Sequence, residues 1–166
     1  MTSGITRYEA EEALIDRFIN GYKNRFGFDL VIVSHRDRPD FEVLNRQTGE
    51  KVGIEITGLY QSEREAKINY GREPSWERFS GSWDLLIANL NHLLAEKAEK
   101  SRGYQYCGRM FLAIYVGSLV FNETNDFDYV HSRIAIPENR FSEIWLMLRD
   151  STGRETVLKA LEMSST

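Results

Sequence analysis

The stretch Phe111 to Val116 constrains the fold most, because its apolar residues occupy both alternating faces of an extended chain. A strand with one face in solvent alternates apolar and polar residues, whereas a strand covered on both faces is apolar throughout. The pattern therefore predicts a central strand with other elements packed against both faces of its sheet. The chain has 166 residues, of which 42% are hydrophobic and 28% charged, and we expect one domain over residues 1–166.

The remaining pattern predicts an α/β order of elements. Thr6 and Glu9 have the spacing of a capping box and mark the start of a helix that ends before Gly27. The expected elements are this helix, strands at 30–33, 41–44 and 51–57, a helix at 83–100 and the strand at 111–116. Beyond them, residues 133–136 are predicted as a short strand and 141–148 as a helix, while 156–161 fit a strand or a helix equally.

Composition indicates a cytoplasmic protein without a membrane partner. No apolar run approaches the roughly 20 residues of a membrane span, and no basic start precedes an apolar stretch. Cys107 is the single cysteine, so the chain has no internal disulfide, and we expect Cys107 to be an inert structural thiol.

Two acids on neighbouring strands are the strongest chemical signal. Asp40 opens the second predicted strand, Glu55 lies near the end of the third, and the turn at 47–50 joins the two strands as a hairpin. Opposed strands would bring both carboxylates to one rim of the sheet, where they repel unless a cation bridges them or one of them takes a proton. Mg²⁺ or Mn²⁺ suits carboxylate and carbonyl oxygens, so Asp40, Glu55 and the carbonyl of Ile56 are the predicted metal ligands.

At these residues the chain resembles the PD-(D/E)XK nuclease superfamily. The quoted segments are Pro39-Asp40 and Glu55-Ile56-Thr57, and the similarity covers roughly residues 8 to 117. The resemblance implies a restriction-endonuclease-like αβββαβ core, with a mixed central sheet flanked by helices. It also implies Mg²⁺-dependent hydrolysis of phosphodiester bonds in DNA, and RNA remains an alternative substrate.

The resemblance also implies a glutamate on the first helix that assists at the metal. Glu11 precedes Leu14 and Ile15 by three and four residues, on the side expected to meet the sheet. Glu12 competes for the same role, and both acids also suit a solvated helix start.

The chain departs from the family at Thr57, which stands in place of the motif lysine. Threonine cannot supply the positive charge that stabilises the transition state. Lys97 is the predicted substitute, because it continues the apolar stripe of the helix at 83–100. Lys51 is four residues from Glu55, about 13 Å along the strand, and Lys67 lies in a polar segment at 61–81 whose structure the pattern leaves open.

The acidic charge balance leaves two alternatives to a DNA nuclease. Twenty-one Lys and Arg oppose 25 Asp and Glu, for a net charge of −4, whereas proteins held to DNA through phosphates usually carry a basic face. One alternative is a catalytically inactive nucleic-acid-binding or protein-interaction domain on the same fold. Another is an unrelated α/β domain with acids at its strand ends. The sequence leaves the oligomeric state open, with a homodimer among the options.

Overall fold

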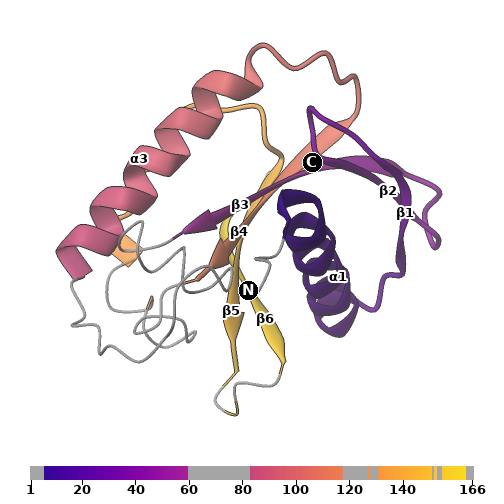
Figure 1. Ribbon diagram of the computed structural model, residues 1–166, viewed down its shortest axis with the longest axis horizontal. Coiled ribbons are helices and arrows are strands. Elements are labelled where there is room, and N and C mark those ends of the chain that lie inside the picture. The colour runs from indigo at the N-terminus through magenta and orange to yellow at the C-terminus, as the bar shows by residue number, and fades with distance from the viewer. Residues whose placement is uncertain are drawn as a thin grey trace.

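A computed structural model describes residues 6–59, 83–117, 127, 131–150, 152 and 155–163 of the chain (Figure 1). The described elements are α1 (Arg7–Phe26), β1 (Leu30–His35), β2 (Phe41–Asn45), β3 (Lys51–Leu59), α3 (Trp83–Ser101), β4 (Arg109–Val116), the 3-10 helix η1 (His131–Arg133), β5 (Glu143–Arg149) and β6 (Thr156–Met163). The chain is therefore an α/β protein, as predicted.

The strands form one six-stranded mixed sheet whose spatial order equals the chain order, β1 to β6. The β1–β2, β2–β3 and β5–β6 pairs are antiparallel, while β3–β4 and β4–β5 are parallel. The predicted β2–β3 hairpin is confirmed, with Phe41 opposite Ile54 and Leu44 opposite Lys51. A parallel pair requires a crossover connection, and α3 lies within the one that joins β3 to β4.

Helix α1 begins and ends at the residues its sequence predicts. The Glu9 N–H donates to Thr6 Oγ1 at 3.2 Å, and the Thr6 N–H donates to the Glu9 carboxylate at 2.9 Å, which completes a capping box. Gly27 ends the helix with φ 75°, a left-handed conformation that costs glycine little, and its N–H donates to the Lys23 carbonyl.

Helices α1 and α3 lie on opposite sides of the sheet (Figure 1), and each closes a separate apolar core. In β4, Phe111 and Ala113 belong to the core under α1, whereas Leu112 and Ile114 belong to the core under α3. The prediction that this strand is covered on both faces is therefore confirmed. Burial on both sides places β4, together with β3, at the centre of the molecule.

The helix predicted at 141–148 is wrong, because these residues form β5. Its apolar residues alternate between the two cores: Ile144, Leu146 and Leu148 face α3, while Trp145 and Met147 face α1. A short apolar run has the same appearance in a buried helix and in a strand covered on both faces, so periodicity did not separate them.

Two other expectations are corrected and one alternative is resolved. The strand predicted at 133–136 is wrong: the chain leaves η1 at Arg133, and Ile134 and Ile136 pack on the α3-side core without joining the sheet. Residues 156–161, left open between helix and strand, belong to β6. Cys107 is exposed between α3 and β4 and so contributes no thiol to a core.

The polar segment at 61–81 lies outside the described residues. Among the helices that are described, none combines the length and apolar character needed to cross a lipid bilayer.

Candidate functional site

The register of the β2–β3 hairpin brings Asp40 and Glu55 together. Asp40 directly precedes Phe41 and Glu55 directly follows Ile54, and Phe41 and Ile54 are partners across the antiparallel pair. The two acids are therefore level with one another, and directly opposed residues of such a pair have Cβ atoms about 5 Å apart. Both side chains are buried, each residue with 4% of its surface exposed.

Asp40 is held by the backbone of β3. Its Oδ2 accepts a hydrogen bond of 2.8 Å from the Ile56 N–H. Burial, followed by repulsion from the Glu55 carboxylate, raises the pKa of Asp40 to about 7. The Asp40 carboxyl therefore titrates near neutral pH, and a nearby cation would favour its ionised form.

Glu55 has one satisfied oxygen and one unsatisfied oxygen. Its Oε1 accepts from Lys97 Nζ at 2.9 Å and from the Tyr104 hydroxyl at 3.0 Å. Its Oε2 is buried and has no hydrogen-bond partner among the described residues. A buried carboxylate oxygen without a partner is costly, so an ion or an ordered water is the natural complement.

Lys97 reaches Glu55 from α3, as its position on the apolar stripe predicts. It follows the buried residues Leu90 and Leu94 by seven and three positions, and its side chain is 14% exposed. The competing Lys51 is exposed at the start of β3, and Lys67 lies outside the described residues. Thr57, two residues beyond Glu55, lies half-buried on the same face of β3 and carries no charge.

Tyr104 is a site residue that the sequence did not reveal. Burial, and then the neighbouring Glu55 carboxylate, raise the pKa of Tyr104, so its hydroxyl keeps its proton and donates. Arg140 orders the segment that carries Tyr104, because its guanidinium donates to the carbonyls of Ser101, Tyr104 and Tyr106. Tyr104 is 49 residues from Glu55, and no local pattern signals that contact.

Glu11, rather than Glu12, lies beside the acid pair. Its Oε1 accepts from Arg7 Nε at 2.8 Å, and its Oε2 is 2.8 Å from His35 Nε2. Glu11 also contributes repulsion to the raised pKa of Asp40. Glu12 instead interacts with the hydroxyl of Tyr8 at the helix surface.

An open pocket of about 500 Å³ joins this end of α1 to Asp40. The His35 ring stacks between Tyr8 and Phe41, with ring centroids 4.5 and 4.2 Å away, and Arg7 lies at the pocket's edge. Sequence reasoning missed both residues: Arg7 has the i,i+4 spacing to Glu11 that a helix brings together, whereas His35 meets Glu11 only where α1 packs against β1. The pocket is lined by Arg7, Tyr8, Glu11, His35, Arg36, Asp37 and Asp40.

A glycine in β3 allows the rings of Pro39 and Tyr106 to approach the strand closely. A Cβ atom at Gly53 would be 2.6 Å from Pro39 Cγ and 3.0 Å from the Tyr106 ring. The Tyr106 hydroxyl donates to Glu42 at 2.8 Å, and the Arg36 guanidinium lies 5.2 Å above the ring. Arg36 is therefore engaged with protein groups at this rim.

The carboxylate oxygens of this site suit a divalent cation that keeps most of its water ligands. Within the described ranges, no group of three or more His, Cys, Asp or Glu side chains is arranged to hold a metal ion. Mg²⁺, however, is commonly bound through only one or two carboxylates, and Asp40 and Glu55 supply those two. Ile56 approaches the site through its N–H, and the predicted role of its carbonyl stays a prediction.

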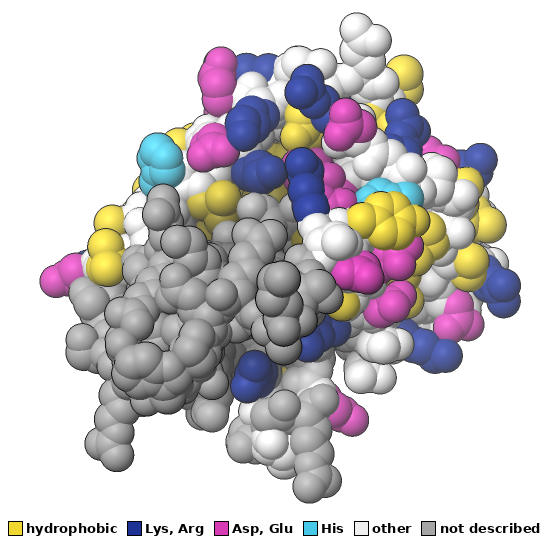
Figure 2. Space-filling model, in the orientation of Figure 1, with side chains coloured by type: hydrophobic (Ala, Val, Ile, Leu, Met, Phe, Trp, Pro, Cys, Tyr) yellow, Lys and Arg dark blue, Asp and Glu magenta, His cyan; other side chains and the backbone are white. Residues whose placement is uncertain are grey.

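The face of the molecule in Figure 2 carries a mixed charge pattern. Basic and acidic side chains are interspersed over its described part, and no large area there has a single sign. Comparisons with protein-family models, with curated proteins and with solved structures returned no match to this chain.

Proposed function

We propose that this chain is a divergent PD-(D/E)XK-type nuclease, which hydrolyses phosphodiester bonds of DNA with a Mg²⁺ or Mn²⁺ ion held by Asp40 and Glu55. The observation that carries the proposal is the unpartnered, buried Oε2 of Glu55 beside an aspartate whose pKa is raised to about 7. Buried polar atoms without a partner are few in folded proteins, and strongly shifted pKa values cluster at functional sites.

The order of elements supports the proposal. The described chain runs α1, β1, β2, β3, α3 and β4, with β3 and β4 parallel and a helix on each face of the sheet. This is the αβββαβ order that the resemblance implies, with Asp40 at the start of β2 and Glu55 within β3.

The protein groups of the site have distinct roles in the proposed reaction. The Ile56 N–H fixes Asp40, while Lys97 and Tyr104 hold Oε1 of Glu55 and leave Oε2 for the ion. A bound divalent cation supplies Lewis acidity to a phosphate oxygen and to the attacking water. Lys97 adds the positive charge that Thr57 cannot, next to the place where negative charge develops on phosphate.

Hydrolysis itself is a simple exchange of bonds. The water oxygen forms a bond to phosphorus as one ester P–O bond breaks; the attacking water loses a proton to solvent, and the departing sugar oxygen takes up a proton. Glu11, oriented by Arg7 and His35 in the pocket that also contains Asp40, would assist from the α1 side by accepting a hydrogen bond from the attacking water.

The test is cleavage of plasmid, linear, single-stranded and branched DNA at low salt with Mn²⁺ or Mg²⁺. We expect weak cleavage by the native chain and none by Glu55→Gln, which keeps the size of the side chain. Glu99→Gln is a matched control, because Glu99 is an exposed acid of α3 that pairs with Arg102. Cleavage that persists in Glu55→Gln would remove Glu55 from the reaction.

One observation favours a second function, a binding domain without catalysis. The Lys97–Glu55 ion pair is largely buried and already neutralises part of the acid charge that a cation would neutralise. A chain that binds metal and nucleic acid, or a protein partner, but cleaves no substrate would have this second function.

An RNA substrate is assayed in parallel with the DNA substrates to decide which nucleic acid the chain cleaves.

A further inference from the structure

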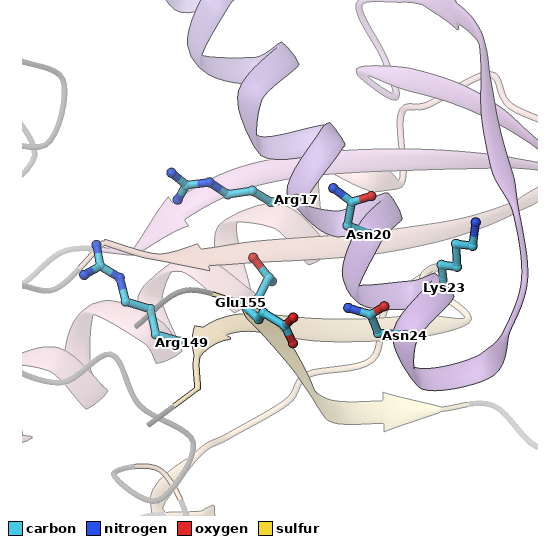
Figure 3. A pocket seen from close by; sticks show the side chains of 7 residues that line it. Arg17, Asn20, Lys23, Asn24, Arg149 and Glu155 are labelled. Atoms are coloured by element: carbon cyan, nitrogen blue, oxygen red, sulfur yellow. The ribbon is translucent and has the colours of Figure 1, made fainter. Parts of the chain in front are cut away.

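A second polar pocket lies between the C-terminal half of α1 and the end of the β5–β6 hairpin (Figure 3). Its volume is about 390 Å³. Arg149 is the last residue of β5 and pairs with Thr156, the first residue of β6. The pocket therefore opens at the carboxyl edge of the parallel strands, where open α/β sheets most often bind ligands. The lining residues are Arg17, Asn20, Lys23, Asn24, Arg149, Glu155 and Thr156.

Close packing holds the two walls of this pocket together. A Cβ atom at Gly21 would lie 3.0 Å from Leu158 Cγ, so the glycine lets α1 approach β6 closely. Arg25 Nη1 donates to the Leu158 carbonyl at 3.0 Å, and the same guanidinium lies 5.1 Å above the Trp145 ring. These contacts hold the two walls together through residues that do not line the pocket.

The lining is rich in cations and hydrogen-bond donors, although the whole chain is acidic. Arg17, Lys23 and Arg149 oppose the single carboxylate of Glu155, while the chain as a whole has a net charge of −4. The Arg17 guanidinium lies 5.3 Å above the Tyr115 ring, which orients it for hydrogen bonding along its edge. Lys23 also pairs with Asp29 at 3.0 Å, but both side chains are well exposed and the pair is weak.

Helical geometry separates this pocket from the acid pair. At 3.6 residues per turn, Arg17, Asn20 and Asn24 are turned about 180 to 240° around α1 from Glu11. Glu11 faces the pocket that contains Asp40, whereas those three residues face β6. The two pockets therefore take different ligands or different parts of one ligand.

We propose that the Arg17–Arg149 pocket is a phosphate-binding site, distinct from the Asp40–Glu55 site. Two arginines present planar forks of donors suited to phosphate oxygens, and the carboxamides of Asn20 and Asn24 add neutral donors on the same helix face. The phosphate belongs to a nucleic-acid backbone or to a small phosphorylated molecule, and both sources share this chemistry. The site does not rest on the proposed nuclease activity.

The first experiment titrates the full chain with inorganic pyrophosphate, in EDTA so that no divalent cation is present. We expect saturable binding that Arg17→Gln and Arg149→Gln each weaken about tenfold, the loss typical of one charge-assisted hydrogen bond. Glu155→Gln should strengthen binding several-fold, because it removes the one carboxylate among the described lining residues. Arg102→Gln removes an exposed arginine at the far end of α3 and should leave the affinity unchanged.

The opposite results would overturn the site. These are no saturable binding, an equal loss in Arg102→Gln, or weaker binding in Glu155→Gln. Thermal melts verify that each variant is folded, which is expected because the substituted side chains are exposed.

A second arm identifies the source of the phosphate with a labelled single-stranded 12-nucleotide DNA. Loss of its binding in Arg17→Gln and Arg149→Gln supports the site as a backbone contact, whereas pyrophosphate binding without DNA binding supports it as a site for a small phosphorylated ligand. Failure of both probes overturns it. Pyrophosphate binding should survive Glu55→Gln, so failure of the nuclease proposal and failure of this site are separately visible.

Discussion

Lys97 Nζ lies 2.9 Å from Glu55 Oε1, although one residue is on α3 and the other is in the middle of β3. The pair is largely withdrawn from solvent, with side-chain exposures of 14% for Lys97 and 6% for Glu55. Glu55 shares the α3-side face of β3 with Leu59, so its cation comes from the helix that covers that face and not from Thr57.

Lys97→Met should separate turnover from metal affinity. If Lys97 stabilises charge on the phosphate, its loss lowers turnover by about 10²-fold or more while metal affinity stays level or rises. The measurement combines single-turnover cleavage with Mn²⁺ titration. Lys100→Met, which removes an exposed lysine paired with Glu96, serves as the control. Equal cleavage rates in Lys97→Met and the native chain would exclude Lys97 from the mechanism.

Asp40→Asn should change how stability depends on pH. Folding raises the pKa of Asp40 from 3.8 to about 7, so the folded chain holds this proton where the unfolded chain has lost it. The resulting contribution to stability is complete below about pH 4 and is lost as pH rises through 7. Asparagine does not ionise, so Asp40→Asn avoids this loss of stability at high pH. Its amide oxygen can still accept a hydrogen bond from the Ile56 N–H.

Urea unfolding at pH 4 and pH 8, without metal, measures this effect. The free energy of unfolding of Asp40→Asn should exceed that of the native chain at pH 8 by on the order of 4 kcal/mol, with little difference at pH 4. Asp37→Asn, at an exposed position, is the control. The same difference at both pH values would mean that Asp40 does not titrate in this way.

Added metal should reverse the order of stability. If the proposed site is correct, Mn²⁺ should raise the melting temperature of the native chain with concentration, whereas Asp40→Asn and Glu55→Gln lack one of the two carboxylates and should respond weakly or not at all. Thermal melts over a Mn²⁺ series decide the matter. An unchanged response in both variants would place the metal elsewhere on the chain.

Tyr104→Phe tests the residue that only the structure revealed. It removes the hydroxyl from Glu55 Oε1 and keeps the ring, so we expect a stability loss of about 1 kcal/mol and slower cleavage at saturating metal. Tyr106→Phe is the matched control, because its hydroxyl donates to Glu42 instead. If both variants cleave at the same rate, Tyr104 has only a structural role.

Gly53→Ala tests the close approach of two rings to β3. The new Cβ would be 2.6 Å from Pro39 Cγ, so the rings must move and we expect a loss of about 1–3 kcal/mol. At Gly103 the nearest atom to a Cβ is the Lys100 carbonyl oxygen at 3.7 Å, an ordinary contact, so Gly103→Ala is the control. Chemical denaturation measures the free energy of unfolding of both variants. Equal values would show that the Pro39 and Tyr106 rings move without a loss of stability.

Local features of the sequence were sufficient to predict most of the described elements. The capping box at Thr6, the turn at 47–50 and the two-sided apolar run of β4 each act over a few residues, so each was visible without a partner. Lys97 was also predictable, since a seven-residue spacing from Leu90 places both residues on one face of a helix.

Tertiary structure decided the features that depend on contacts between distant segments. The run at 144–148 became a strand because it lies between two apolar cores, and its own pattern is the same for a buried helix. Tyr104, His35 and Arg7 reached the site only through the packing of α1 and α3 on opposite faces of the sheet. Local pattern alone placed Asp40 and Glu55 on the β2–β3 hairpin. The choice of their partners required the fold, because those partners are brought within hydrogen-bonding distance by core packing and not by chain proximity.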